Sequence, residues 1–332
     1  MRRAAPQFAA PVLLVLVAAL LGEAASSATQ IYFLDALISV TIVVGLYIFI
    51  GNTGVLSFGH ISFVALGAWT AGVLTVPSSE KPAIMPNLAG FLRHTTVGNE
   101  PSLALAALVG GVFALLVGLA LMRLSGLAAG IATFAVLEIV HNVLRYYEKI
   151  GPGLNTFSSV PETTGVWQAA IGALIAVGVA FAYQRSRFGR MLRASREDPA
   201  AATAAGISVY RQRLGAFVLS GLVAGFAGGL YVHLLPLNTE AVYLDLTFVT
   251  LAMLVVGGSS SLLGAVVGAL AISALDSFLA NAENGVTIFG VTMNFPSGTR
   301  VIVEGVLMAL VLILRPSGLT GGREFSLGSL RR

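Results

Sequence analysis

The sequence contains no cysteine, which excludes disulfide frameworks, thiolate metal sites and cysteine nucleophiles. Charge is also scarce: the 332 residues include only 19 Lys and Arg and 15 Asp and Glu. That is 10% of the chain, against about 25% in a soluble domain. Apolar residues make up 56%, and the mean hydropathy is +0.89. So few charges cannot cover so much apolar surface in water, and a disordered chain would be polar, so the composition indicates a polytopic membrane protein.

Lysine is limited to Lys81 and Lys149, and a glutamate precedes each of them. A phosphate-binding loop ends in Gly-Lys-Ser or Gly-Lys-Thr, so this chain has no ATP site of that kind. The four histidines stand far apart, and Glu138-x-x-His141 is a single, isolated pair where a dinuclear site needs two. We therefore expect no catalytic residue, no metal site and no cofactor bound by this chain.

Ten apolar runs approach the length of about 20 residues that a helix needs to cross a bilayer. They are 8–22, 31–50, 61–76, 102–122, 126–147, 166–183, 214–235, 247–256, 262–280 and 300–314. The run at 247–256 is too short to cross alone, and we interpret it as one arm of a hairpin broken at 257–261. The fold class is therefore all-α, a polytopic membrane helix bundle of about 9–10 transmembrane segments with broken helices.

The positions of the basic residues predict the orientation of the bundle. With the N-terminus in the cytoplasm, 14 of the 19 lysines and arginines lie on the inner side, seven of them in the loop 184–213. Both termini are then cytoplasmic, in the plasma (inner) membrane. Because topology explains the basicity, we expect no nucleic-acid partner. The first run also resembles a signal peptide, although the charge alternation favours an uncleaved helix.

Small residues recur at every fourth position in three of the runs, where they allow helix backbones to approach closely. These faces are Gly221, Gly225 and Gly229; Gly110, Ala114 and Gly118; and Gly264 with Gly268. Two further stretches, 51–60 and 257–264, break their hydrophobic runs with several glycines. Irregular backbone at membrane depth lines a cavity or is buried in protein, so each break is either part of a transport pathway or a tight turn on the inner side.

A polar stripe marks the run 126–147, where Glu138, His141 and Arg145 stand at i, i+3 and i+7. It either borders a pathway or forms an interhelical hydrogen-bond network. Arg300 and Glu304, at i and i+4, predict an intrahelical ion pair. Asp35 and Asp276 are placed toward the outer face, so no chain of ionisable groups crosses the bilayer centre as a proton relay would.

The loop 184–213 predicts a short cytoplasmic helix at 197–206. Ser195 and Asp198 fit a helix N-terminal box, Pro199 suits the first turn, alanines follow, and Gly206 ends the helix. The smooth face of this helix would fit a groove on another protein. Alternatively, it is a connector that rests on anionic lipid.

Four ordered motifs carry a family resemblance from about residue 31 to residue 320. They are Gly51-x-x-Gly54-x-x-Ser57-x-Gly59-His60-x-x-Phe63-x-x-x-Gly67-Ala68; Arg196-Glu197-Asp198 through Gly206-Ile207 with Gly225-x-x-Gly228-Gly229-x-Tyr231; Gly257-Gly258-x-x-Ser261-x-x-Gly264-x-x-x-Gly268-Ala269; and Arg315-Pro316-Ser317-Gly318-Leu319. In these the chain resembles the permease subunits of branched-chain amino acid ABC importers of the LivM type.

The resemblance implies a transmembrane permease domain over 1–320 and a cytoplasmic tail over 321–332. Its expected partners are a second related permease, two cytoplasmic ABC ATPases that hydrolyse ATP, an extracytoplasmic substrate-binding protein and the lipid bilayer. The residues expected to couple to the ATPases are Glu197, Asp198, Ala201, Ala202, Ala204, Ala205 and Gly206. The residues expected near the translocation path are Gly54, Ser57, Gly59, His60, Thr133, Glu138, His141, Gly257 and Gly258. A urea or short-amide ABC permease is the nearest alternative, and an ion-coupled secondary transporter or channel is the rival of another class.

Overall fold

A computed structural model describes residues 5–283, 285–288, 291–293, 295–296, 298–315, 317–322 and 324. These residues form ten long helices, as the apolar runs predicted. The long helices are α1 (Ala5–Ala24), α2 (Ser27–Thr53), α3 (Ile61–Thr75), α6 (Asn99–Leu121), α7 (Gly126–Tyr146), α8 (Val166–Arg185), α11 (Val209–Val232), α12 (Leu244–Gly257), α13 (Leu262–Glu283) and α14 (Thr299–Leu314). Eight candidate spans, all except those of α3 and α14, are long and apolar enough to cross a membrane by length and composition.

Shorter elements join the long helices. They are α4 (Lys81–Ile84), α5 (Gly90–Arg93), η1 (Glu148–Ile150), α9 (Arg187–Glu197), α10 (Pro199–Ala204), η2 (Glu240–Val242), β1 (Val286–Ile288) and β2 (Val291–Met293). The two strands pair antiparallel as a small hairpin, with Val286 opposite Met293. The predicted all-α membrane bundle is confirmed, with this hairpin as a local addition between α13 and α14.

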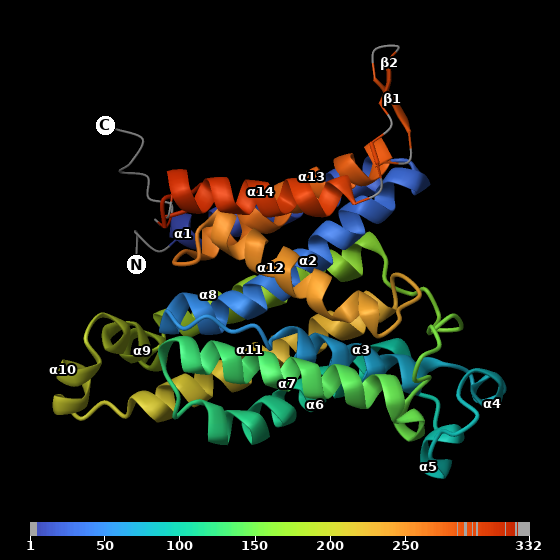
Figure 1. Ribbon diagram of the computed structural model, residues 1–332, viewed down its shortest axis with the longest axis horizontal. Helices are drawn as coiled ribbons and strands as arrows, with labels where there is room; N and C mark the ends of the chain where they lie inside the picture. Colours follow the sequence, from blue (N-terminus) through green and yellow to red (C-terminus); the bar gives the residue numbers. More distant parts are fainter. Residues whose placement is uncertain are drawn as a thin grey trace.

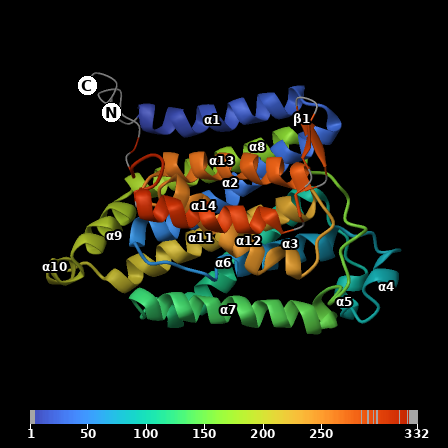
Figure 2. The ribbon, with the colours of Figure 1, turned by 45° about the horizontal axis from the view of Figure 1, so that its top comes forward.

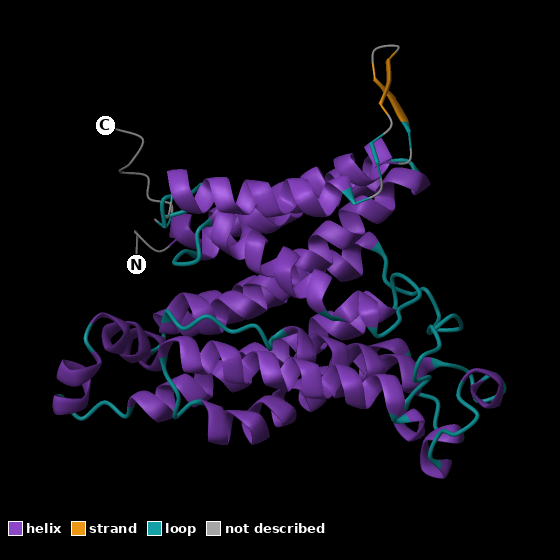
Figure 3. Cartoon of the chain, in the orientation of Figure 1, coloured by secondary structure: helices purple, strands orange, loops and turns teal. Residues whose placement is uncertain are grey.

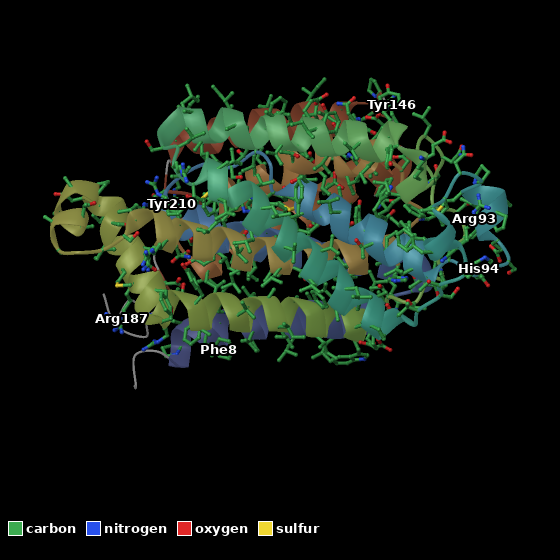
Figure 4. All side chains as sticks on the ribbon, turned by 90° about the horizontal axis from the view of Figure 1, so that it is seen from below. Phe8, Arg93, His94, Tyr146, Arg187 and Tyr210 are labelled. Carbon is green, nitrogen blue, oxygen red and sulfur yellow. The ribbon has the colours of Figure 1, made fainter. Side chains whose placement is uncertain are left out.

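The long helices lie roughly side by side, so the bundle has two ends (Figure 1). α9 and α10 project from one end, and α4, α5 and the β-hairpin project from the other. Arg187 and Tyr210 lie at the first end, and Arg93, His94 and Tyr146 lie at the second (Figure 4). α1 and α7 cover opposite faces, with α2, α11 and α12 between them (Figure 2). The loop 184–213 and the connection that holds α4 and α5 therefore lie at opposite ends of the bundle, as the charge pattern predicted.

α2 forms the centre of the core, because every residue from Ala36 to Thr53 is buried. A helix that is apolar on all sides is expected in such a central position. The small-residue faces pack as predicted. A methyl group added at Gly225 would lie 2.4 Å from the Ala106 carbonyl oxygen, and one at Gly221 would lie 2.4 Å from the Ala114 Cβ. Backbone contact between α6 and α11 therefore depends on these small residues.

The two glycine breaks fold differently. α2 ends at Gly54, which adopts φ +70°, and the chain then runs without helix until α3 begins at Ile61. Figure 3 shows this loop running along the helices, from the α9–α10 end toward the middle of the bundle. By contrast, α12 ends at Gly257 and α13 begins at Leu262. The predicted hairpin of α12 and α13 is therefore confirmed.

Candidate functional site

The loop 184–213 folds into two helices rather than one. α9 ends at Glu197, and Asp198 caps α10 by accepting hydrogen bonds from the Ala200 and Ala201 amides, both at 2.9 Å. The prediction that Ser195 forms the N-terminal box is therefore wrong, because Ser195 is buried within α9 and donates to the Leu192 carbonyl. Gly206, with φ +80°, ends the α10 segment as predicted.

α10 presents a small, exposed surface at the α9–α10 end. Of the residues predicted to couple to ATPases, Ala202 is buried, and Glu197, Asp198, Ala201, Ala204, Ala205 and Gly206 are exposed. A six-residue helix of this composition has too little apolar surface to form a core of its own. The geometry leaves the other alanines of α10 accessible to another molecule.

Arg196 connects α9 to the first glycine break. Its Nη1 donates to the Gly51 carbonyl oxygen at 3.0 Å, and its side chain packs so closely on Gly54 that an added methyl group there would lie 2.9 Å from Nε. The second break meets the same point, since a methyl group at Gly51 would lie 2.9 Å from the Ser259 carbonyl oxygen. Arg196 therefore contacts the first break at the point where the second break packs against it.

The first break continues into a buried polar group. The Phe58 amide donates to the Thr133 Oγ1 on α7 at 3.2 Å, and a methyl group at Gly59 would lie 2.2 Å from the Thr133 carbonyl oxygen. Ser57 and His60 are 1% and 3% exposed, and the Ser57 Oγ lies 2.7 Å from the His60 Nδ1. The structure thus brings Ser57, Gly59, His60 and Thr133 together, as one cluster against α7.

His60 lies in an aromatic cage. The ring centroids of Phe49, Phe63 and Phe217 lie 5.4, 5.5 and 5.4 Å from that of the imidazole. The buried Nε2 of His60 has no hydrogen-bond partner among the described residues. Such an orphaned polar atom needs an explanation, because burial without a partner costs about 1–3 kcal/mol.

The polar stripe of α7 is tied to the segment that leads into α12. The Tyr243 hydroxyl and the Asn142 amide both donate to the Glu138 carboxylate. Arg145 pairs with Glu240, and the His141 ring stacks on Tyr243 with centroids 3.8 Å apart. The interhelical network that the spacing allowed is present, at the end of the bundle opposite α10. It lies apart from the Ser57–His60 cluster along α7.

Gly257 and Gly258 belong to a third place, where the C-terminal segment covers the second break. The Leu319 amide donates to the Val256 carbonyl at 2.7 Å, and Thr320 donates to the Gly257 carbonyl through both its amide and its hydroxyl. The Glu324 carboxylate accepts from the Leu262 amide at 2.9 Å and so caps α13. Of the predicted tail 321–332, only residues 321, 322 and 324 are among the described residues.

Burial raises the pKa of the Glu324 carboxyl, and this effect outweighs the hydrogen bonds from α13 and the positive charge of Arg193, which both lower it. A carboxylate that caps a helix is usually favoured in its charged form. Here the buried position dominates. The charged form of this cap is therefore less favoured than that of a carboxylate in water.

Arg300 does not pair with Glu304, so the predicted intrahelical pair is wrong. The Arg300 Nε lies 3.0 Å from the Asp276 Oδ1 on α13 instead. A partner on a neighbouring helix outcompetes the i, i+4 neighbour because it can meet the guanidinium side on. Asp35 and Asp276 lie toward the α4–α5 end, in the arrangement that the sequence placed at the outer face.

Sequence reasoning missed the partners that these groups use. Glu240, Tyr243 and Asp245 fall where a loop meets a short helix, and no periodicity marks such positions. The aromatic residues around His60 come from α2, α3 and α11 and share no local pattern. An unpaired acidic residue in the first turn of an apolar helix was the one available signal, at Asp245.

Residues 28–314 match the family model described as "Branched-chain amino acid transport system / permease component". The chain belongs to this family. It is therefore a membrane-spanning, multi-pass transport subunit of the ABC permease type.

Individual relatives point the same way. The chain is 25% identical over 310 residues to the LivM permease of the high-affinity branched-chain amino acid transport system of Salmonella typhimurium, with 83% of this chain and 66% of that protein covered. It is 33% identical over 156 residues to a probable LivH permease of Methanocaldococcus jannaschii, covering 45% of each. The xylose permease XylH of Escherichia coli is 28% identical over 165 residues, covering 48% of this chain and 38% of that protein.

The matched region thus spans about half the length of the LivH relative and about two thirds of the length of the LivM relative. No solved structure matches the chain significantly.

Proposed function

We propose that this chain is one permease subunit of an ATP-driven importer of branched-chain amino acids. A second, related permease completes the translocation path, an extracytoplasmic binding protein delivers the substrate, and two cytoplasmic ABC ATPases hydrolyse ATP. The α9–α10 end is then cytoplasmic, as are both termini. Family membership and the names of the LivM and LivH relatives support this proposal.

The observation that carries the coupling step is the contact of Arg196 with Gly51 and Gly54. α10 is exposed for docking, and α9 leads directly into it without a flexible linker, because Asp198 caps the end of α9 and the start of α10. A shift of α10 would move Arg196, and Arg196 would move the backbone of the first break. Ser57 and His60 lie in that break and Thr133 contacts it from α7, so the motion would change their positions relative to one another.

Substitution of Ala204 tests the docking role. Ala204→Arg places a long cation in the exposed face of α10, so we expect ATP-dependent leucine uptake to be lost although the chain still inserts. Ala194→Arg is the matched control, because Ala194 is exposed on α9 outside the α10 surface. Proteoliposomes with the complete transporter report uptake, and co-purification reports the bound ATPase subunits.

Unchanged uptake in Ala204→Arg would refute docking through α10. Uptake that survives ATP depletion, with no ATPase recovered, would refute the ABC importer and favour an ion-coupled transporter or a channel. ATP-driven uptake of urea in place of leucine would retain the mechanism and replace the substrate.

A further inference from the structure

A cavity of about 400 Å³ lies near the α4–α5 end, between α2, α11, α12, α13 and α14. Its polar lining comprises Tyr32, Asp35, Ser39, Tyr231, Asp245, Asp276, Ser277 and Arg300. We call this space the outer acidic cavity. It is distinct from the Ser57–His60 cluster and from the stripe on α7, and Tyr231 is the one lining residue that belongs to a sequence motif.

The charges around the outer acidic cavity do not balance. Arg300 is its one cation among the described residues, and Arg300 pairs with Asp276 through Nε at 3.0 Å and Nη1 at 3.5 Å. The side-chain carboxylates of Asp35 and Asp245 make no hydrogen bond or ion pair with another described residue. Two carboxylates are therefore left to face the cavity.

A separate observation strengthens the case for a ligand. Glu304, one turn after Arg300, is only 6% exposed, and its Oε1 has no hydrogen-bond partner among the described residues. It lines an adjoining cavity of about 290 Å³ that shares Asp245, Val249 and Arg300 with the first. The Glu304 carboxyl also hydrogen-bonds with Asp276, so Oε1 is the one oxygen of this group left open to a further donor.

The donor set suits an ammonium group better than a metal ion. No cluster of three or more His, Cys, Asp or Glu placed to hold a metal occurs among the described residues. An ammonium brings three N–H donors and can bridge carboxylates that are too far apart to share a metal. Arg300 contacts Asp276 through Nε and Nη1, which leaves Nη2 to donate to a ligand, and a guanidinium N–H is a frequent partner of a carboxylate. Leu246, Val249 and Met253 add an apolar wall.

We propose that the outer acidic cavity binds an aliphatic amino acid as its zwitterion. Asp35 and Asp245 take the ammonium group, Arg300 takes the carboxylate, and the apolar wall takes the side chain. This inference rests on the proposed importer function and deepens it, because it places a substrate site within this one subunit. It also separates amino acids from urea, which carries neither charge.

Binding of tritiated leucine to the full-length chain in lipid nanodiscs tests the site without ATP or partner subunits. We expect Asp245→Asn and Asp35→Asn each to weaken leucine binding roughly tenfold or more, because each removes a charged hydrogen-bond partner. Glu162→Gln is the matched control, since Glu162 is exposed and does not line the cavity. The melting temperature of each variant without leucine shows whether it has folded.

Competitors identify which part of leucine is recognised. Leucinol, which has the ammonium and the side chain but no carboxylate, should compete more strongly than 4-methylpentanoate, which lacks the ammonium. Urea and NaCl should not compete. If an Asp→Asn variant fails to fold, Val249→Trp offers a second test, because it fills the cavity without changing a charge and should abolish binding.

Leucine binding that is unchanged in both Asp→Asn variants, or in a folded Val249→Trp variant, would overturn the site. Equal competition by urea, or displacement by NaCl alone, would overturn the zwitterion. Failure of ATP-driven uptake leaves these binding results standing, and failure of binding leaves the ATPase test of α10 standing. The two proposals therefore fail separately.

Discussion

The segments 51–60 and 257–264 both interrupt a hydrophobic run with glycines, yet the chain continues differently after each. After Gly54 the backbone stays without helix until Ile61, and it carries Ser57 and His60 into the buried interior. After Gly257 the chain turns within a few residues and starts α13, and the segment 317–322 covers the turn. The first break crosses part of the depth of the bundle, and the second is a clamped hairpin turn.

This difference separates two hypotheses that the sequence left open for both breaks. Buried irregular backbone must be satisfied by side chains, and the first break uses Thr133 for this purpose. The second break satisfies its carbonyls with neighbouring backbone and with Thr320. The first break has the polar, unwound character expected beside a transport pathway, whereas the second has the character of a structural joint.

The largest effect is expected at this joint. Gly257→Ala would place a methyl group 1.9 Å from the Gly264 carbonyl oxygen, where both atoms belong to packed backbone. We expect a loss of about 3 kcal/mol in stability, the upper part of the range for overpacking. The melting temperature of the purified chain measures it.

A helical glycine with free space provides the control. A methyl group at Gly178, on α8, meets nothing within 4 Å, so Gly178→Ala should leave stability unchanged or raise it by up to about 1 kcal/mol. If Gly257→Ala melts like Gly178→Ala, then α12 and α13 do not pack through this glycine.

A smaller effect, on coupling rather than on stability, is expected where the two breaks meet. Arg196→Met keeps a long apolar stem beside Gly54 but removes the donor to the Gly51 carbonyl. Loss of a charged hydrogen bond is worth about 1.5 kcal/mol, or about tenfold. We expect leucine uptake to fall by that factor while the reconstituted transporter still hydrolyses ATP.

The Arg190 side chain is exposed on α9 and makes no hydrogen bond or ion pair with another described residue, so Arg190→Met is the matched control. An equal loss of uptake in the two variants would show that positive charge on α9, and not the bond to Gly51, matters for transport. Uptake at the natural level in Arg196→Met would show that the bond is not needed.

The sequence was sufficient to predict the helices, because an apolar run of about 20 residues has few possible structures other than a helix in a membrane. It also predicted the close approach of α6 and α11, since Gly221 and Gly225 have no other packing role than to admit a neighbouring backbone. The end of the α10 segment at Gly206 followed from local chemistry alone.

The partners of the polar groups were beyond the reach of the sequence. Arg300 had Glu304 one turn away, and only the packing of α13 on α14 brought Asp276 into place. Ser195 had the right spacing for a cap, but Asp198 took that role because Pro199 fixes where α10 begins. Local sequence rules suggest possible partners for a polar side chain, and contacts between helices that are distant in sequence decide which partner it has.

A moderate effect, on transport alone, is expected inside the first break. His60→Phe keeps a flat ring in the cage of Phe49, Phe63 and Phe217 and removes the orphaned Nε2, although Ser57 loses its partner. These opposing terms should keep the stability within about 1 kcal/mol of the natural protein. If the first break lines the pathway, leucine uptake falls severalfold at unchanged melting temperature.

Ser57→Ala tests the hydrogen bond of this pair separately from the packing of the His60 ring, because it removes the hydroxyl and leaves the imidazole in place. A drop in melting temperature of His60→Phe with full uptake per folded molecule would assign His60 to packing and would make the two breaks alike.

The smallest effect is expected at the cap that closes the second break. Burial raises the pKa of Glu324 in the folded chain above its ordinary value of 4.5. At a pH between 4.5 and this raised pKa, the folded chain holds a proton that the unfolded chain has released. Stability therefore falls as the pH rises through this window, and the cost is fully present above it. Glu324→Gln keeps an oxygen to accept from the Leu262 amide and removes the titration. From about pH 4 to about pH 8, the melting temperature of the natural chain should fall relative to the variant, by the equivalent of less than about 1 kcal/mol. A difference that stays constant, or one that grows in favour of the natural chain, would show that Glu324 is not buried in the charged form and that the C-terminal segment does not clamp the turn.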